Sequence, residues 1–336
     1  MSRKGPQVLY KFSRGPIFKV KLRHHPRLRS ITVSNVDSQR RDRVVGCVLG
    51  LALGDALGAP FEFRRARDVP TPVPAFELPW RGGPPGSTTD DTAMALNLVA
   101  SLTERGRFDG VDLLARHVAW LATDPPDVGT LTRRVLQPVA RGERDAALAL
   151  WEERGPEVSA GNGSVMYCAP LGAAHAGRPE ELFELAPAMS ALTHWDERCR
   201  TACLAVTLTV ASLVRGEPPE SSLTAAIAVV QDRPGGEELE FLVEAVGTTR
   251  PIDGPDQGFC LFTAAAGLQA LARGGSFEQE LLGVVSLGGD TDTNAAVAGA
   301  ILGARDGARA LPGRWLSKLQ DRHRLQAAGG ALADCF

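Results

Sequence analysis

The stretch "RVVGCVLGLALGDALG", residues 43–58, places a glycine at every fourth position of an otherwise apolar segment. In an α-helix, residues four apart share one face, so Gly46, Gly50, Gly54 and Gly58 would form a stripe of bare backbone. Each glycine lowers helix stability by about 1 kcal/mol relative to alanine, which indicates that the stripe is needed. We expect another helix to pack against it at short distance.

A candidate partner lies near the other end of the chain, in "SLGGDTDTNAAVAGAIL", residues 286–302. Residues 292–304 have the pattern of a second helix, with small residues again four apart at Ala295, Gly299 and Gly303. We predict that the two small-residue faces meet.

Most of the remaining chain is rich in alanine and leucine with helical periodicity, and no run alternates as a strand would. The expected helices are 90–105, 109–121, 131–153, 164–189, 196–215, 220–231, 236–247 and 258–285. Breaks are expected within 131–153, within 164–189 and, near residue 274, within 258–285. The sequence therefore predicts one compact all-α domain over residues 39–325, followed by a tail over residues 326–336.

Residues 1–38 form a basic N-terminal extension ahead of this domain. Residues 1–36 carry nine lysines and arginines and no acid, whereas the rest of the chain has 28 basic against 39 acidic residues. The net charge of −2 gives no general reason to expect nucleic acid. The extension is open to three interpretations: a disordered segment or misplaced start, a phosphate-binding tail, or a targeting segment without the apolar core of a secretion signal.

Six cysteines are scattered without the spacing of a disulfide framework, so we expect reduced thiols and a cytoplasmic protein. Cys199 and Cys203, with His194 nearby, could be imagined as zinc ligands, but small buried cysteines are common in cores. No apolar run is expected to cross a membrane, because the run 44–54 stops at Asp55 and the run 201–214 is too short.

One connection is unusually long. "VPTPVPAFELPWRGGPPGS", residues 69–87, holds six prolines and three glycines and cannot be helical. Loops of this length are typical of lids and binding loops. It leads directly into "STTDDTAMAL", residues 87–96, where an apolar helix begins with hydroxyls and carboxylates.

Two clusters of oxygen-bearing side chains thus stand at two helix starts. Either cluster alone is explained by helix capping. Together they would repel unless a cation lay between them, since neither motif contains a lysine or arginine. Oxygen ligands favour Mg²⁺ or Mn²⁺. A calcium EF-hand beginning at Asp290 is excluded, because Ala295 and Ile301 stand where that loop needs glycine and glutamate.

Five motifs resemble the ADP-ribosylglycohydrolase family in order and spacing: "GCVLGLALGDALGAPFEF", "TTDDT", "GNGSVMYCAPLG", "ALTHWDERC" and "SLGGDTDTNAAVAGAILGA". The resemblance covers about residues 41–310. It implies a compact orthogonal bundle of helices of that family's type. It also implies two Mg²⁺ or Mn²⁺ ions at the base of a cleft that holds ADP-ribose.

The resemblance also implies residue roles. Asp91 is assigned to catalysis as well as to metal binding, and Glu62 is the candidate general base that would activate water. Asp55 could act directly or only in support, and Tyr167 stands where family members usually have arginine. The implied metal ligands are Thr89, Asp90, Asp91, Asp290, Asp292 and Thr293. The implied substrate-binding residues are Gly161, Asn162, Gly163, Ser164, His194 and Phe259.

These roles imply a metal-dependent hydrolase that cleaves the glycosidic bond between ADP-ribose and an acceptor. The expected partner is an ADP-ribosylated protein or small-molecule conjugate. No membrane partner is expected, and nucleic acid is expected only through the basic extension or as an ADP-ribosylated substrate. Two alternatives stay open at this point: a non-catalytic ADP-ribose-binding protein on the same fold, and a dinuclear-metal nucleotide phosphohydrolase.

Overall fold

The computed structural model describes the backbone of residues 26–336 and the side chains from residue 36 onward. The chain divides into two units, residues 1–36 and residues 37–336. The predicted disorder of the extension concerns residues 1–38, of which 1–25 lie outside the described residues and 26–38 belong to the first helix. The core and both oxygen clusters lie within the second unit, residues 37–336.

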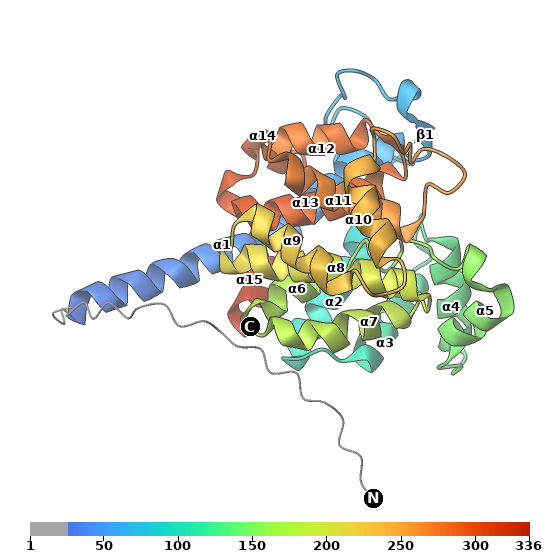
Figure 1. The fold of residues 1–336 in the computed structure, drawn as a ribbon, viewed down its shortest axis with the longest axis horizontal. Coiled ribbons are helices and arrows are strands. Elements are labelled where there is room, and N and C mark those ends of the chain that lie inside the picture. Colours follow the sequence, from blue (N-terminus) through green and yellow to red (C-terminus); the bar gives the residue numbers. More distant parts are fainter. Residues whose placement is uncertain (1–25) are drawn as a thin grey trace, which may run out of the picture. The chain divides into compact units, whose positions relative to one another are not determined.

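The described chain is helical, with two strands of two residues each (Figure 1). The helices are α1 (Pro26–Gly58), α2 (Asp90–Arg105), α3 (Gly110–Leu121), α4 (Thr130–Ala140), α5 (Ala146–Arg154), α6 (Ala169–Ala174), α7 (Leu182–Ala191), α8 (Glu197–Arg215), α9 (Pro219–Val230), α10 (Gly236–Ala245), α11 (Cys260–Arg273), α12 (Phe277–Val285), α13 (Thr291–Asp306), α14 (Gly313–Leu316) and α15 (Arg322–Cys335). The strands are β1 (Arg64–Arg65) and β2 (Gly288–Gly289). The all-α prediction is confirmed.

The core is built around α13, which contacts α2, α6, α8, α11 and α12. Residues 291–304 of α13 are all buried, and α8 and α11 are buried along most of their length. Figure 1 shows α11 and α13 side by side within the bundle. A helix that is apolar on all faces is typical of the centre of a domain, and this one carries the acidic cluster at its start.

The glycine stripe of α1 packs directly on α13, as predicted. A Cβ atom at Gly50 would lie 2.1 Å from the carbonyl oxygen of Gly299, and a Cβ atom at Gly299 would lie 2.1 Å from the carbonyl oxygen of Gly50. At Gly54 the corresponding distance, to the oxygen of Ala295, would be 1.8 Å. The two backbones touch, so any side chain on the stripe would separate the helices.

The segment Val36–Phe61 is long and apolar enough to cross a membrane, and 94% of its most apolar window is buried within the fold. Burial against α13 explains this composition, because helices at the centre of a core pass the same test of length and apolarity.

Two local predictions were wrong. Helix α6 begins at Ala169, so Ser164 does not start it. Instead the amide groups of Val165 and Met166 donate to the carbonyl oxygen of Asn162, at 2.8 and 3.1 Å, which makes a tight turn. Residues 326–336, expected as a tail, belong mostly to α15, where Leu325 and Leu332 are buried. The adjacent Gly329 and Gly330 lower the intrinsic helix propensity of that segment.

The proline-rich loop forms no helix between residues 69 and 87, as predicted. Phe76 and Trp80 anchor it, since their side chains are 6% and 8% exposed. The loop is thereby held against the domain just before α2 begins.

Candidate active site

The two oxygen clusters meet at Asp91, near the start of α2. The hydroxyl groups of Thr89 and Thr293 donate to its Oδ2 atom, at 3.2 and 3.5 Å. Thr89 comes from the start of α2 and Thr293 from the start of α13, which is 202 positions from Asp91, so the two motifs share one carboxylate oxygen. The close packing of α1 and α13 brings the second motif to the first.

Two buried carboxylate oxygens in this cluster, Oδ1 of Asp91 and Oδ1 of Asp292, have no hydrogen-bond partner among the residues that the structure describes. Both residues are at most 2% exposed. An unpaired buried carboxylate oxygen is costly, so such atoms usually have a partner. Their chemistry is that of ligands for a hard divalent cation. The side chains at the start of α13 do not cap it either, because its N-cap, Asp290, makes no side-chain capping bond.

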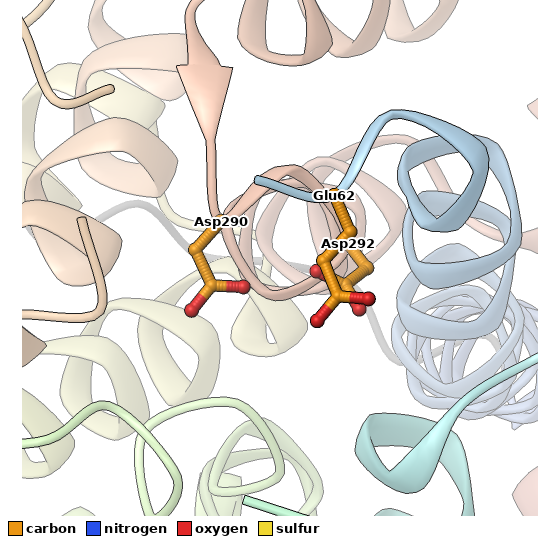
Figure 2. Close-up of side chains that lie close together, drawn as sticks. All are labelled: Glu62, Asp290 and Asp292. Atoms are coloured by element: carbon orange, nitrogen blue, oxygen red, sulfur yellow. The ribbon is translucent and has the colours of Figure 1, made fainter. Parts of the chain in front are cut away.

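Glu62 faces the same cluster from the other side of the β1–β2 pair. Its carboxylate lies with those of Asp290 and Asp292, with one oxygen of each within 4.8 Å of the others (Figure 2). The backbone fixes this approach, since β1 pairs antiparallel with β2 and the amide of Phe63 donates to the carbonyl oxygen of Gly289 at 2.7 Å. Glu62 is therefore held beside the expected metal ligands.

The electrostatics of the cluster are those of crowded carboxylates. Burial, followed by the nearby charges of Asp127 and Asp290, raises the pKa of Glu62 to about 8. Burial, and then Asp127, raises the pKa of Asp90 to about 7, against the effect of a 3.1 Å hydrogen bond from the Gly129 amide. The pKa values of Asp91 and Asp292 are raised well above the usual range, mainly by burial.

Asp55 supports α2 from within α1. Its carboxylate accepts hydrogen bonds from the amides of Thr89, at 3.0 Å, and Thr92, at 3.1 Å, and from the Thr92 hydroxyl. Burial raises its pKa to about 6, against the effect of these bonds. All the hydrogen bonds of Asp55 serve the start of α2, so in this structure it positions the first oxygen cluster.

A cleft of about 420 Å³ opens over the cluster, and most of the residues predicted to bind substrate line it. Its lining includes Glu62, Asp90, Gly161, Asn162, Gly163, His194, Gly258, Asp290, Asp292 and Thr293. Asn162 links the turn to the acidic cluster, since its side-chain amide donates to Asp290 Oδ2 at 2.9 Å. A Cβ atom at Gly163 would lie 2.7 Å from the His194 ring, so only glycine lets this turn pack on the imidazole.

His194 lies in the wall of the cleft as a neutral imidazole. It is 1% exposed, and burial lowers its pKa to about 4. Its Nδ1 atom is 2.9 Å from the hydroxyl of Thr193, which orients the ring. A neutral ring suits hydrogen bonding to a ligand without adding charge.

Ser164, Phe259 and Tyr167 are not among the residues that line the cleft, and nor are the buried Asp55, Thr89 and Asp91. The Ser164 hydroxyl lies 2.9 Å from that of Ser190 in the interior. The Phe259 ring packs edge-on against Phe262, with centroids 5.3 Å apart. Tyr167 is fully buried against His117, with ring centroids 5.2 Å apart. The family's usual arginine at that position therefore has no direct counterpart in the cleft wall.

Two charged residues at the cleft, Arg81 and Asp127, were not predicted from the sequence to belong to the site. Arg81 Nη2 lies 3.7 Å from Glu62 Oε2 and 3.2 Å from Asp127 Oδ1. Neither cluster motif contains a basic residue, but the proline-rich loop brings this one beside Glu62. The only sequence signal was the position of both residues in loops rich in proline and glycine.

The fold and site thus define an all-α protein with an acidic, oxygen-rich centre at the base of a cleft. The family model for ADP-ribosylglycohydrolase matches residues 36–336. The ADP-ribosyl-[dinitrogen reductase] glycohydrolase of Rhodospirillum rubrum is 32% identical, over 83% of this chain and 90% of that protein. The ADP-ribosylarginine hydrolase Tri1 of Pseudomonas putida (strain GB-1) is 26% identical, over 91% and 82%.

A solved structure described as an ADP-ribosylglycohydrolase-related protein complex is also similar. The two sequences are 36% identical, and the TM-score is 0.75. The match covers 89% of this chain and 99% of the chain in that structure. The chain belongs to the ADP-ribosylglycohydrolase family. It is a hydrolase of the glycosidic bond between ADP-ribose and an acceptor.

Proposed function

We propose that the acidic cluster binds two Mg²⁺ or Mn²⁺ ions and that the chain removes mono-ADP-ribose from a protein side chain, with arginine as the acceptor. The observation that carries the metal site is the pair of buried, unpartnered oxygens on Asp91 and Asp292, one from each cluster. The proposed ligands are Thr89, Asp90, Asp91, Asp290, Asp292 and Thr293. Bound divalent ions would orient the attacking water and lower its pKa.

In this proposal Glu62 is the general base. Its carboxylate accepts a proton from the attacking water, whose oxygen forms a bond to C1″ of the ribose. The bond from C1″ to the acceptor nitrogen breaks with its electron pair going to the nitrogen, and Glu62 passes the proton that it took from the water to the leaving guanidine. Positive charge that develops at C1″ is stabilised by the surrounding carboxylates, as in other glycosidic cleavages. Asn162 and His194 hold the substrate in the cleft from the opposite wall.

Arginine is the proposed acceptor because of the relative from Pseudomonas putida, which is named an ADP-ribosylarginine hydrolase. We place the activity in the cytoplasm, since all six cysteines are free and five are buried. The test is a hydrolysis panel of ADP-ribosyl-arginine, ADP-ribosyl-serine, ADP-ribosylated nucleic acid and O-acetyl-ADP-ribose, each assayed with Mg²⁺, Mn²⁺ and EDTA. We expect release of ADP-ribose from the arginine conjugate, with metal only. Release that persists in EDTA would contradict the metal site, and preference for another conjugate would contradict the acceptor.

Stability of the metal-free protein should depend on pH because of the same carboxyls. The folded protein has raised pKa values of about 8 at Glu62 and about 7 at Asp90, so it favours their protonated forms. The two protonated carboxyl groups contribute fully to the free energy of unfolding below about pH 4, near their pKa values in the unfolded chain. This contribution is lost as the pH rises to about 8, near their pKa values in the folded protein. Divalent cations reverse the loss by binding the ionised carboxylates.

We therefore expect the gain in melting temperature on adding Mg²⁺ to grow steadily from pH 5 to pH 8. Differential scanning fluorimetry at pH 5, 6.5 and 8, in EDTA and in Mg²⁺, measures this gain. A gain that is the same at all three pH values would contradict binding to these carboxylates. The same series on Asp306→Asn, at the other end of α13, serves as a control and should follow the wild type.

A further inference from the structure

A second cavity, of about 270 Å³, adjoins the cleft. The two spaces share Asp90 and Asp127 in their linings, so the second cavity lies directly beside the acidic cluster. None of the residues assigned to ADP-ribose binding, such as Asn162 or His194, lines it. Its function is therefore not explained by the ADP-ribose part of the substrate.

The walls of this cavity come from segments that are far apart in sequence, and backbone contacts fix them. Trp80 belongs to the proline-rich loop, Trp120 to the end of α3, and Asp321 to the turn before α15. The loop and the turn touch, since a Cβ atom at Gly86 would lie 2.1 Å from the carbonyl oxygen of Lys318. The amide of Gln320 also donates to the Gly86 carbonyl oxygen at 3.0 Å. Hence the cavity is built into the fold.

The lining combines aromatic surface with carboxylates. Two tryptophans and two prolines supply apolar faces, and three aspartates face a single arginine: Trp80, Trp120, Pro125, Pro126, Asp90, Asp127, Asp321 and Arg324. In the described part of the chain, Asp321 and Arg324 make no ion pair within 4.0 Å of each other, and both are exposed. Aromatic rings beside carboxylates recognise a cation carried on an apolar stem.

The chain itself shows that a guanidinium is bound at the edge of this cavity. Arg81 Nη2 lies 3.2 Å from Asp127 Oδ1, and Arg81 Nη1 donates to the carbonyl oxygen of Pro126 at 2.6 Å. The Arg81 Cζ atom lies 5.1 Å from the centroid of the Trp80 ring. Arg81 is not among the lining residues, so the volume of about 270 Å³ is left for a second group.

We infer that this cavity is an acceptor-side subsite that binds an arginine or lysine side chain of the protein substrate, close in its sequence to the ADP-ribosylated residue. The inference rests on the proposed function, in which the acceptor is a side chain of a protein. Because Asp90 and Asp127 line both the cavity and the cleft, a side chain bound in the cavity would lie beside the acidic cluster at which the glycosidic bond is cleaved. Asp321, which is exposed and stands among the Trp80 and Trp120 rings, is the carboxylate that would meet a basic side chain there.

The experiment compares two ADP-ribosyl-arginine peptides that differ only in their flanking residues, lysine or arginine in one and glutamine in the other. Wild-type protein should hydrolyse the basic peptide with a kcat/KM about fivefold to tenfold higher, through a lower KM. Asp321→Asn and Trp120→Leu should each reduce this ratio to about twofold or less. Asp124→Asn is the matched control, because Asp124 and Asp321 are both exposed and have φ values of 52° and 55°. The ratio should be retained in that variant.

Equal kcat/KM values for the two peptides would overturn the subsite, as would a ratio that survives both Asp321→Asn and Trp120→Leu. A preference for ADP-ribosylated nucleic acid over the basic peptide would overturn it as well. Free ADP-ribosyl-arginine, assayed with the wild type, separates this result from the proposed acceptor. If that compound is not hydrolysed, arginine is the wrong acceptor, and the same flanking comparison on ADP-ribosyl-serine peptides decides the subsite.

Discussion

Replacing Asp292 by asparagine is expected to lower kcat/KM for an ADP-ribosyl conjugate by about 10²–10³-fold while the metal-free protein becomes more stable. The first effect follows from losing a charged ligand, since divalent ions contribute several kcal/mol to such reactions and each tenfold in rate corresponds to about 1.4 kcal/mol. The second effect follows from the position of Asp292. It is 2% exposed, has an unpartnered Oδ1 atom, and is crowded by other carboxylates.

A purely structural role for Asp292 predicts the opposite change in stability. Losing a well-paired buried carboxylate destabilises a protein, whereas losing an unpaired one relieves repulsion and desolvation. Melting temperatures of the variant and the wild type in EDTA distinguish these cases, and steady-state kinetics in Mg²⁺ measures the activity. Asp306→Asn, on the same helix and paired with Arg305 at 2.7 Å, is the matched control. It should retain activity. Near wild-type turnover in Asp292→Asn would refute its role as a ligand.

The helices and the meeting of α1 with α13 could be predicted because both depend on local patterns. Apolar periodicity defined the helices, and glycines four residues apart have few explanations other than close backbone packing. The start of α6 at Ala169 and the helix α15 were not predicted. In the first case backbone hydrogen bonds to one carbonyl oxygen replaced a helix start. In the second, tertiary packing of Leu325 and Leu332 outweighed the low helix propensity of two adjacent glycines.

The acidic residues of the site were apparent from the sequence because two motifs of unusual composition carried them. Arg81 and Asp127 were not apparent, since a lone charged residue in an irregular loop has no pattern that fixes its position. Only the fold shows that the loop ending at α2 brings Arg81 to within 3.7 Å of Glu62. Ser164 and Phe259 illustrate the reverse case, in which a residue belongs to a functional motif but its side chain does not line the cleft.

Replacing Gly54 by alanine is expected to destabilise the protein by about 3 kcal/mol and to lower its melting temperature by about 6–12 °C. The added Cβ atom would lie 1.8 Å from the carbonyl oxygen of Ala295 and 2.8 Å from the amide nitrogen of Ala296. These are backbone atoms, so no side-chain rotation relieves the clash and the helices must separate. Asp55 lies on α1 and Glu62 follows its end, whereas Asp290 and Asp292 lie at the start of α13. Separating the two helices would move these carboxylates apart, so the protein that still folds should also lose activity.

The sign of this effect is a direct test of the packing. Without the close contact, alanine would stabilise the helix by about 1 kcal/mol relative to glycine, so the two possibilities differ in direction. Thermal and urea unfolding of Gly54→Ala, with kcat measured on the folded fraction, decides between them. Gly177→Ala is the control, since a Cβ atom there would have no neighbour within 4 Å, and it should change stability by less than about 0.5 kcal/mol. A stabilised Gly54→Ala variant would mean that α1 and α13 are not in backbone contact, and the proposed metal site, which depends on that contact, would lose its structural basis.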